Sequence, residues 1–576
     1  MLRASIHTQV ERQVLKQPAL HLAETKTEEY NDFAGLASLS VPQFSKAFLE
    51  TLPATWNIVC LTLGEHKEEL LMSRLRSEEH PLTLRTPFKR QSAIECDEET
   101  FDFAEAKKEM TEIVELANQS SQNGGDIINR DDKVAWWDLR RSLDKRLGDL
   151  LSNMEGIWLG GFRGIFDSRR TTLDSLAKFE ESLHFSLGKY LPSRQKSGAS
   201  TTAHLLLDSQ IVGLFTALGA PSDNNDIDEQ VLDLMYFVVD SLQFKGERNA
   251  YDEIDFDSVS SPLELHSLNF ANCSQLVIET VDSLRQYHLA RNDAELEGDG
   301  QHTILILDKN LHCFPWESLP CLKGKSVSRL PSLMCLHERL LSIQQMQSKQ
   351  SSRTVGQQGC TALASRNNGA YILNPSGDLA NTQERFEAPL SMLAGWDGAT
   401  EQKPSEQQFK DYLENRDVFL YFGHGSGGQY IRSRTIKKLK RCAVSLLMGC
   451  SSGMLNEAGE YEPYGKPLDY MLAGSPALLA NLWDVTDKDI DKFAQSVLEK
   501  WGLFGHQKTV TAPKSPVKRG RGRKGKGVAT ELTECEEADR TPMPLDKAVA
   551  RSRDVCILKY LNGAAPVIYG VPVMLE

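Results

Sequence analysis

The sequence lacks the features that mark membrane-spanning and secreted proteins. It has no run of about eighteen apolar residues, so we expect no membrane span. Residues 1–18, MLRASIHTQVERQVLKQP, contain no apolar core and do not resemble a secretory signal. Positive charge is also in the minority, because 65 basic residues stand against 79 acidic ones. The resulting net charge of −14 disfavours nucleic-acid binding by the surface as a whole.

Cysteine and histidine are present, but not in the arrangements that bind metals or build disulfide scaffolds. The eleven cysteines are scattered, odd in number and without a Cys-x-x-Cys pair. The thirteen histidines show no His-Glu-x-x-His pattern. We therefore expect no disulfide framework, no metal and no other cofactor, and a reducing compartment.

At 576 residues the chain is too long for one hydrophobic core, and its pattern predicts an α/β architecture. Short apolar runs bounded by glycine or turn residues predict a mostly parallel sheet flanked by helices. The predicted strands lie at 56–63, 82–84, 303–307, 370–373, 418–422, 443–448 and 477–483. A helix is predicted over 65–76, and a last strand at 567–569 is expected to close the sheet.

Helical patterns dominate residues 1–55 and about 100–245. The second region reads as a helical insertion, and its clearest stripe predicts a seam against a partner helix: Leu143, Leu147, Leu150, Met154 and Ile157. We interpret the insertion as a scaffold without chemistry, compatible with docking of another protein. An acidic segment that ends in Ser-Ser-Pro predicts a boundary between a domain at 1–262 and a second at 263–576.

A low-complexity segment lies near the end of the chain. Between residues 508 and 530 there are eight Lys or Arg residues and no acidic residue, and an acidic stretch follows. This composition cannot bury a core, so we expect a disordered loop at about 506–541. The basic part resembles a nuclear-import or phosphate-binding tract, but a solvated loop explains it equally well. Direct nucleic-acid binding therefore stays open.

The stretch 418–453 carries the clearest chemical signal. Two predicted strands end in Gly-His-Gly and in Gly-Cys-Ser-Ser-Gly, which places His424 and Cys450 at neighbouring strand ends. Either residue alone is often an ordinary buried side chain, but together they suit a cysteine nucleophile and its base. The N–H groups of Gly425 and Cys450 would form an oxyanion hole. A nearby imidazolium is expected to lower the pKa of the thiol.

A third predicted strand end supplies carboxylates. Trp483 is followed by Asp484, Asp487, Asp489 and Asp491 at the start of a helix with an apolar stripe. Acidic residues suit the positive end of a helix, which explains at least one of them. On a helical wheel Asp487 and Asp491 border the stripe, whereas Asp489 points well away. A partly desolvated carboxylate at that edge would pair with a substrate Arg or Lys, with Asp491 preferred to Asp487.

At these residues the sequence resembles the separase family, in particular the C-terminal protease region of its fungal-type members. Five segments of the C-terminal half carry the resemblance: FPWESLP at 314–320, LNPSGDL at 373–379, FGHGSGG at 422–428, LLMGCSSG at 446–453 and ANLWDVTDKDID at 480–491.

The resemblance implies a caspase-like (clan CD) cysteine endopeptidase. It implies that His424 and Cys450 are the catalytic dyad. It also implies that an Asp of 484–491 lines the pocket for the arginine before the scissile bond. The domain before the protease would be a pseudo-protease or substrate-like domain. The implied substrate is the kleisin subunit of cohesin, cut after Arg in Glu-x-x-Arg, which opens the cohesin ring at anaphase.

Further expectations follow from the same resemblance. Securin is the implied inhibitor, occupying the cleft as a pseudosubstrate. The implied location is the cytoplasm and nucleus, at chromosomes and spindle in anaphase. The long helical-repeat region of full separases, a further expected partner, is absent, so we expect the sequence to be a fragment. Gly449 and Ser451 beside the nucleophile match separases rather than caspases, which argues against an Asp-specific pocket. Residues that would read the substrate glutamate are not identified.

Two other functions compete with this interpretation. One is another caspase-like, Arg-specific peptidase, and the other is a catalytically dead caspase-fold adaptor. A separate hypothesis concerns self-cleavage after Arg540, because Glu537-Ala-Asp-Arg540 fits Glu-x-x-Arg within a predicted loop. The alternative to self-cleavage is that so short a motif occurs here by chance. Mapping of N-termini after incubation tests it, and a missing new terminus at Thr541 while a cohesin peptide is cleaved would overturn it.

Overall fold

A computed structural model describes most of the chain. The described residues are 40, 43–44, 48–77, 79–89, 101–122, 130–168, 173–190, 207–222, 227–244, 270–290, 301–349, 361–505 and 542–576. Four predictions lie outside them: most of the helical pattern at 1–55, the boundary at 262, the basic tract at 508–526 and the cleavage site at Arg540.

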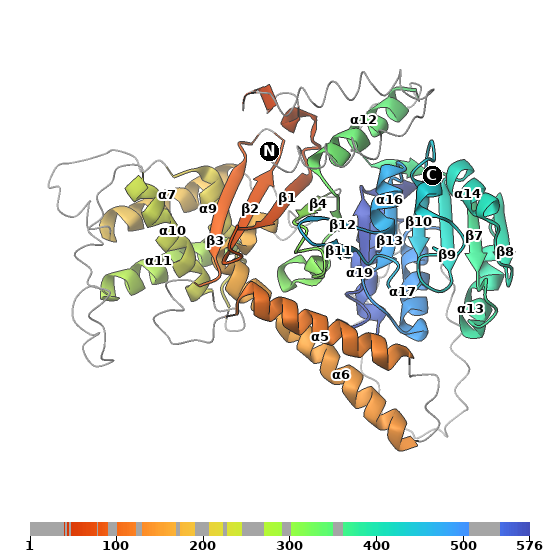
Figure 1. Ribbon diagram of the computed structural model, residues 1–576. Coiled ribbons are helices and arrows are strands. Elements are labelled where there is room, and N and C mark those ends of the chain that lie inside the picture. Colours follow the sequence, from red (N-terminus) through yellow and green to blue (C-terminus); the bar gives the residue numbers. More distant parts are fainter. Residues whose placement is uncertain are drawn as a thin grey trace, which may run out of the picture.

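One eleven-stranded sheet runs through the molecule in the order β3-β2-β1-β4-β5-β14-β13-β10-β9-β7-β8 (Figure 1). Neighbouring strands are parallel except within β3-β2-β1 and between β14 and β13. The strands are β1 (Trp56–Leu63), β2 (Glu69–Leu75), β3 (Leu82–Pro87), β4 (His302–Leu307), β5 (Val327–Arg329), β7 (Gly369–Leu373), β8 (Trp396–Thr400), β9 (Val418–Phe422), β10 (Val444–Leu447), β13 (Ala477–Asn481) and β14 (Pro566–Gly570). The predicted mostly parallel α/β fold is confirmed.

Two local predictions were wrong. Most of the segment 65–76 forms β2 rather than a helix, because Leu70 and Met72 alternate with half-buried positions and face the core with period two. A turn at Lys67, whose φ is +60°, folds β2 back on β1. The last predicted strand, β14, does not lie at the edge of the sheet. It lies between β5 and β13, antiparallel to β13.

Two small sheets stand apart from the main one. They pair β11 (Asn456–Ala458) with β12 (Tyr461–Tyr464), and β6 (Ala362–Ala364) with β15 (Val573–Leu575). The β11–β12 hairpin directly follows the loop that contains Cys450.

The predicted helical insertion is confirmed, and its first two helices form a long hairpin. In Figure 1, α5 (Phe103–Gln122) and α6 (Arg130–Asn153) lie side by side beneath the main sheet. Ion-paired contacts between Glu109 and Arg146 show that the two helices are antiparallel, since α5 starts where α6 ends. The predicted seam is buried along α6 and the turn after it, at Leu143, Leu147, Leu150 and Met154.

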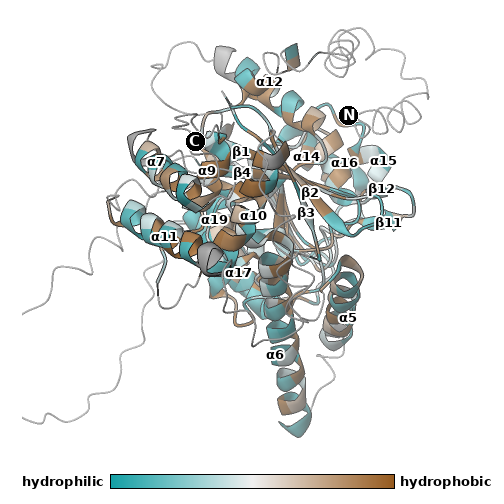
Figure 2. Cartoon of the chain, turned by 90° about the vertical axis from the view of Figure 1, so that its left-hand side faces the viewer, coloured by the Kyte–Doolittle hydropathy of each residue, from teal (hydrophilic) through white to brown (hydrophobic). Residues whose placement is uncertain are grey.

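The rest of the insertion and the helix that follows it gather beside β3 (Figure 1). The insertion continues with a π-helical turn η3 (Met154–Leu159), a 3-10 segment η4 (Gly160–Phe166), and the helices α7 (Leu173–Tyr190), α9 (Ser209–Thr216) and α10 (Asp228–Phe244). Helix α11 (Phe270–Leu289) lies beyond its predicted end at about 245. Figure 2 shows hydrophilic and hydrophobic residues on each of the surface helices, as expected for helices that pack on one side. Among the described residues, no helix is both long and apolar enough to cross a membrane.

Shorter helices cover the second half of the sheet. They are α12 (Leu333–Lys349), α13 (Ala380–Ser391), α14 (Glu406–Asn415), α15 (Ser433–Ile436), α16 (Lys466–Leu472), α17 (Asp487–Lys500) and α19 (Leu545–Ser552). Single 3-10 turns occur at η1 (Leu49–Thr51), η8 (Trp316–Ser318), η9 (Pro320–Leu322) and η10 (Arg553–Val555).

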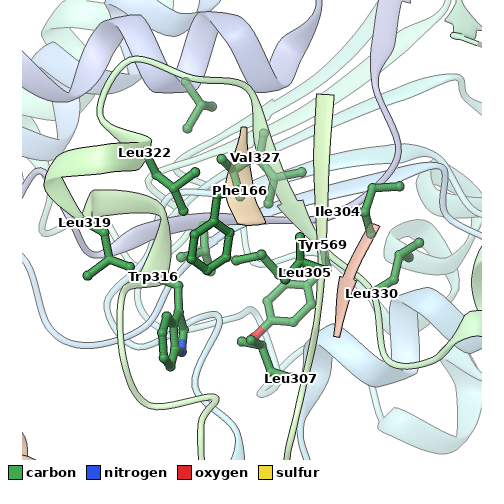
Figure 3. Packing of buried hydrophobic residues seen from close by; sticks show 14 of the residues in the cluster. Phe166, Ile304, Leu305, Leu307, Trp316, Leu319, Leu322, Val327, Leu330 and Tyr569 are labelled. Carbon is green, nitrogen blue, oxygen red and sulfur yellow. The ribbon is translucent and has the colours of Figure 1, made fainter. Parts of the chain in front are cut away.

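The hydrophobic core is continuous across the two predicted domains. Figure 3 shows Phe166 from the insertion among Leu305 of β4, Val327 of β5, Trp316 of η8 and Tyr569 of β14. All five side chains are buried. Strand β1 pairs with β4, so the sheet also runs without a break from the first part to the second. The division at residue 262 stays a prediction.

Buried charge pairs stand at the same junction. His302 of β4 pairs with Asp546 of α19, with Nδ1 and Oδ2 2.9 Å apart. Arg329 of β5 pairs with Glu317 of the FPWESLP segment and also donates to the carbonyl oxygens of His312 and Phe314. These pairs hold polar groups that would otherwise be costly to bury.

Candidate active site

Two adjacent parallel strands deliver the residues that were predicted to be the base and the nucleophile. Strands β9 and β10 pair in register, with Leu447 beside Tyr421, and both are buried along their whole length. Their carboxyl ends therefore open into loops at the same edge of the sheet. One loop carries His424 and the other carries Cys450, as the sequence predicted.

The two loops touch through glycines. A Cβ atom on Gly449 would lie 2.0 Å from the carbonyl oxygen of Gly425 and 2.4 Å from that of Gly423. Only glycine fits there, so Gly449 lets the nucleophile loop lie directly against the histidine loop. Gly425 itself has a φ of +60°, a conformation that glycine adopts without strain.

His424 is held by a carboxylate that the sequence analysis missed. Its Nε2 lies 2.8 Å from Oδ2 of Asp378, and both side chains are about half exposed. The hydroxyl of Tyr421 donates to the carbonyl oxygen of His424 at 2.9 Å. Asp378 is the acidic residue of the LNPSGDL segment after β7, the strand next to β9. That adjacency was the available signal, because parallel neighbours end at the same edge of the sheet.

Cys450 is partly buried, and its thiol donates to the carbonyl oxygen of Val485 at 3.3 Å. Burial is the largest cause of a raised pKa for this thiol, and the nearby carboxylates of Asp484 and Asp487 act in the same direction. The hydrogen bond to Val485 opposes them, and the resulting pKa is about 11. The expected lowering of the thiol pKa was therefore wrong in direction.

The peptide that precedes Cys450 has a fixed orientation. Asn481 at the end of β13 donates its side-chain amide to the carbonyl oxygen of Gly449 at 3.0 Å. Since the C=O and N–H of a trans peptide point in opposite directions, the N–H of Cys450 points away from Asn481. The predicted oxyanion hole uses this N–H together with the N–H of Gly425. The close approach of Gly449 to Gly425 keeps the two loops that carry these groups together.

The carboxylates after β13 have different surroundings, although they lie on one helix. Asp491 is buried and accepts a hydrogen bond from Thr382 of α13 at 2.9 Å. Burial raises its pKa to about 7. Burial also raises the pKa of Asp487, and the charge of His424 opposes this, which places Asp487 near the imidazole.

Asp489 differs from its wheel prediction. It does not point to solvent but is almost fully buried, and it accepts hydrogen bonds from the N–H groups of Ile557 and Leu558 and from the amide of Asn562. The segment 557–562, which follows α19 and η10, packs on this side of α17. A helical wheel considers only one helix and cannot predict such a contact. Asp489 is thus committed to structure, which leaves Asp487 and Asp491 as the candidates for reading arginine.

Within the part of the chain that the structure describes, no group of three or more His, Cys, Asp or Glu side chains lies close enough to hold a metal ion. The site consists of a thiol, an imidazole with a carboxylate partner, the exposed carboxylate of Asp487 and the buried carboxylate of Asp491. Such a set suits nucleophilic attack by sulfur beside a pocket for a positive side chain.

A family model described as "Separin, protease domain" matches residues 65–490. The chain belongs to the separin family. Two curated separins match most of the chain: that of Emericella nidulans is 46% identical over 92% of it, and that of Schizosaccharomyces pombe is 41% identical over 93%. The resemblance drawn from the five sequence segments is confirmed.

A solved structure agrees with this assignment. The crystal structure of the Saccharomyces cerevisiae separase–securin complex at 2.6 Å resolution matches with a TM-score of 0.73 and 30% identity. The match covers 92% of this chain and 31% of the separase chain. The chain also spans only 23% and 26% of the two curated separins, about a quarter of their length.

Proposed function

We propose that this chain is the protease part of a cysteine endopeptidase that cleaves after Arg in Glu-x-x-Arg sequences. The observation that carries the proposal is the contact of the Cys450 and His424 loops through Gly449. Asp487, whose pKa responds to the charge of His424, and Asp491 lie on α17, the helix that follows the next strand end. Membership of the separin family supports it. The caspase-like (clan CD) type is part of the proposal and rests on the resemblance to the separase family.

The residues of the site suit the steps of peptide hydrolysis. The Cys450 thiol gives its proton to His424 as sulfur attacks the substrate carbonyl carbon, since a pKa of about 11 leaves little thiolate beforehand. Nε2 of His424 donates to Asp378, so Nδ1 is the nitrogen that accepts this proton.

The N–H groups of Gly425 and Cys450 stabilise the oxyanion, and the imidazolium protonates the leaving amine. Water then hydrolyses the thioester and restores the thiol.

Specificity for arginine is assigned to Asp491, with Asp487 as its neighbour. A guanidinium forms strong charge-assisted hydrogen bonds with a carboxylate, and more so where water is excluded. Asp491 is buried and anchored by Thr382, so its carboxylate is held in one place before substrate arrives.

The substrate we propose is the kleisin subunit of cohesin, cut to release sister chromatids at anaphase. Securin is the proposed inhibitor, in line with the solved relatives, which are separase–securin complexes. The helical-repeat region typical of full separases is a further proposed partner. The proposed location is the cytoplasm and nucleus, with chromosomes and spindle at anaphase.

Covalent labelling tests the proposal. The chain is incubated with a peptidyl acyloxymethyl ketone that ends in arginine and has glutamate three residues earlier. We expect one adduct on Cys450 by mass spectrometry and no adduct in Cys450→Ser. Cys313→Ser is the matched control, because Cys313 is another described thiol outside the site, and it should label like the wild type.

The competing functions give different results. A folded chain that is not labelled at Cys450 would contradict the peptidase and favour a dead adaptor. Labelling at Cys450 without cleavage of a kleisin peptide would favour another Arg-specific, caspase-like peptidase.

A further inference from the structure

The helical hairpin α5–α6 reaches the active site, although it belongs to the insertion that was interpreted as scaffold. The side-chain oxygen of Asn118 on α5 accepts a hydrogen bond from the backbone N–H of Asp484 at 3.0 Å. These residues are 366 positions apart in the sequence. Asp484 is the first residue after the Trp483 that follows β13, so the hairpin touches the strand end beside the nucleophile.

Asp484 passes this contact to the nucleophile loop. Its Oδ1 accepts a hydrogen bond from the hydroxyl of Ser451 at 2.6 Å, and the N–H of Ser451 donates to the carbonyl oxygen of Trp483 at 3.2 Å. Ser451 follows Cys450 directly and has a φ of +50°, which a serine adopts only when its surroundings enforce it. The two hydrogen bonds supply that enforcement.

Helix α6 holds the other side of the same strand end. Asp144 accepts hydrogen bonds from the N–H groups of Tyr560 and Leu561, both at 2.8 Å. Leu561 in turn accepts from the indole N–H of Trp483 at 2.7 Å. Trp483 is therefore fixed from the hairpin as well.

The buried guanidinium of Arg140 adds a second link from α6. It donates to the side-chain oxygen of Asn562 at 3.1 Å, and the amide of Asn562 donates to the hydroxyl of Thr486. Trp483 and Thr486 flank Asp484 and Val485, and Val485 accepts the hydrogen bond of the Cys450 thiol. Burial lowers the pKa of Arg140, and the nearby carboxylates of Asp489 and Asp144 oppose this.

We propose that the α5–α6 hairpin positions the active-site nucleophile, and that Asn118 is the positioning residue that does so through Asp484 and Ser451. Asn118 fixes the backbone at Asp484, Asp484 holds Ser451 in its left-handed conformation, and Ser451 sets the direction of Cys450. Because it names a positioning residue for that peptidase site, this inference rests on the proposed function.

The test compares Asn118→Ala with the wild type in the whole 576-residue chain. We expect kcat for a Glu-x-x-Arg peptide to fall at least ten-fold with KM changed less than two-fold, because Asn118 holds the nucleophile loop and does not contact the substrate pocket residues. Hydrogen–deuterium exchange of the peptide covering 448–454 should become about ten-fold faster. Gln119→Ala, an exposed amide beside Asn118 on the same helix, is the matched control and should behave like the wild type.

Two further variants separate positioning from loss of folding. Asp484→Ala keeps the backbone N–H that Asn118 accepts but removes the link to Ser451, so it should reproduce both the kcat loss and the faster exchange at 448–454. If Asn118→Ala melts at a lower temperature than the wild type, kcat and the exchange at 448–454 in Asp484→Ala decide whether the contact positions the nucleophile loop. The double variant Asn118→Ala with Ser451→Ala should be no slower than Ser451→Ala alone, since both act on one chain of contacts.

Unchanged exchange at 448–454 in Asn118→Ala, an unchanged kcat, or effects that multiply in the double variant would each overturn the inference. Failure of the proposed function gives another result: the wild type itself would not cleave the peptide. The exchange measurement would then still test the coupling.

Discussion

At the scale of single residues, burial gives identical side chains different chemistry. Asp489 and Asp491 are two positions apart on α17, and both are buried. Asp489 accepts three hydrogen bonds from the segment that follows η10, whereas Asp491 accepts one from Thr382. Few donors and little water raise the pKa of Asp491 to about 7, so its ionisation is ready to respond to a cationic ligand.

Asp491 therefore predicts a pH dependence of arginine recognition. Below its pKa of about 7 the carboxyl is protonated and cannot form an ion pair with guanidinium, so kcat/KM for an Arg peptide should fall as the pH is lowered through 7. Asp491→Asn should lower kcat/KM at pH 8 by about 100-fold, as expected for loss of one partner of a buried charge pair. The remaining activity of Asp491→Asn should no longer fall as the pH is lowered through 7. Steady-state kinetics between pH 6 and 9 measure both.

A stability measurement serves as the control for that variant. A carboxyl whose pKa is raised on folding costs stability where it is ionised, so this cost develops as the pH rises from about 4 to about 7. Asp491→Asn should thus be more resistant to urea than the wild type at pH 8. Lower resistance, or a pH profile of kcat/KM identical to that of the wild type, would contradict the role assigned to Asp491.

At the scale of elements, the site depends on the close approach of the loops that follow β9 and β10. Gly449→Ala would place a methyl group 2.0 Å from the carbonyl oxygen of Gly425 and must push the two loops apart. We expect a loss of unfolding free energy of about 1–3 kcal/mol and loss of labelling at Cys450. Thermal melting and the acyloxymethyl ketone measure these effects.

Gly428→Ala is the matched control for Gly449→Ala, because Gly428 belongs to the histidine loop that Gly449 contacts but lies outside the contact itself. Its added Cβ would be 3.4 Å from Lys466, an ordinary contact. It should melt and label like the wild type. If Gly449→Ala and Gly428→Ala melt and label alike, the site does not require the close approach of the two loops at Gly449.

Elements were predicted well where their residues alone decide the pattern. Strands β4, β9, β10 and β13 are buried at every position, and their mostly apolar runs are recognised without knowing their neighbours. Strand β2 was missed for the opposite reason. Only one of its faces is fully buried, and consecutive leucines at 70 and 71 also fit a helix. Pairing with β1 and β3 decided the outcome.

At the scale of the molecule, one sheet unites segments from both ends of the sequence. The pair of His302 and Asp546 lies inside this junction, where Ser328 also contacts His302 with Oγ 2.8 Å from Nε2. The imidazole of His302 lowers the pKa of Asp546, although burial opposes it. Asp546 therefore contributes stability above its unfolded pKa of about 4, and this contribution is lost as the pH falls through the lower folded pKa.

Asp546→Asn should reduce the free energy of unfolding at pH 7 by about 3–5 kcal/mol, as is typical when one partner of a buried charge pair is removed. Urea denaturation measures the change. Asp554→Asn is the control, because Asp554 forms a more exposed pair with Lys323 and should change stability by less than about 1 kcal/mol. A similar small change in Asp546→Asn would contradict a stabilising role for the junction pair.

The sequence by itself determined which residues make up the candidate site. Buried parallel strands and their glycine-bounded ends are local patterns, so His424, Cys450 and the acidic segment at 484–491 were found without any contact information. Tertiary structure alone decided what completes the site. Asp378 reaches His424 across 46 residues, and Asn118 reaches Asp484 across 366. Contacts between segments so far apart leave no local pattern, because each depends on which strands become neighbours in the sheet and which helices cover its edge.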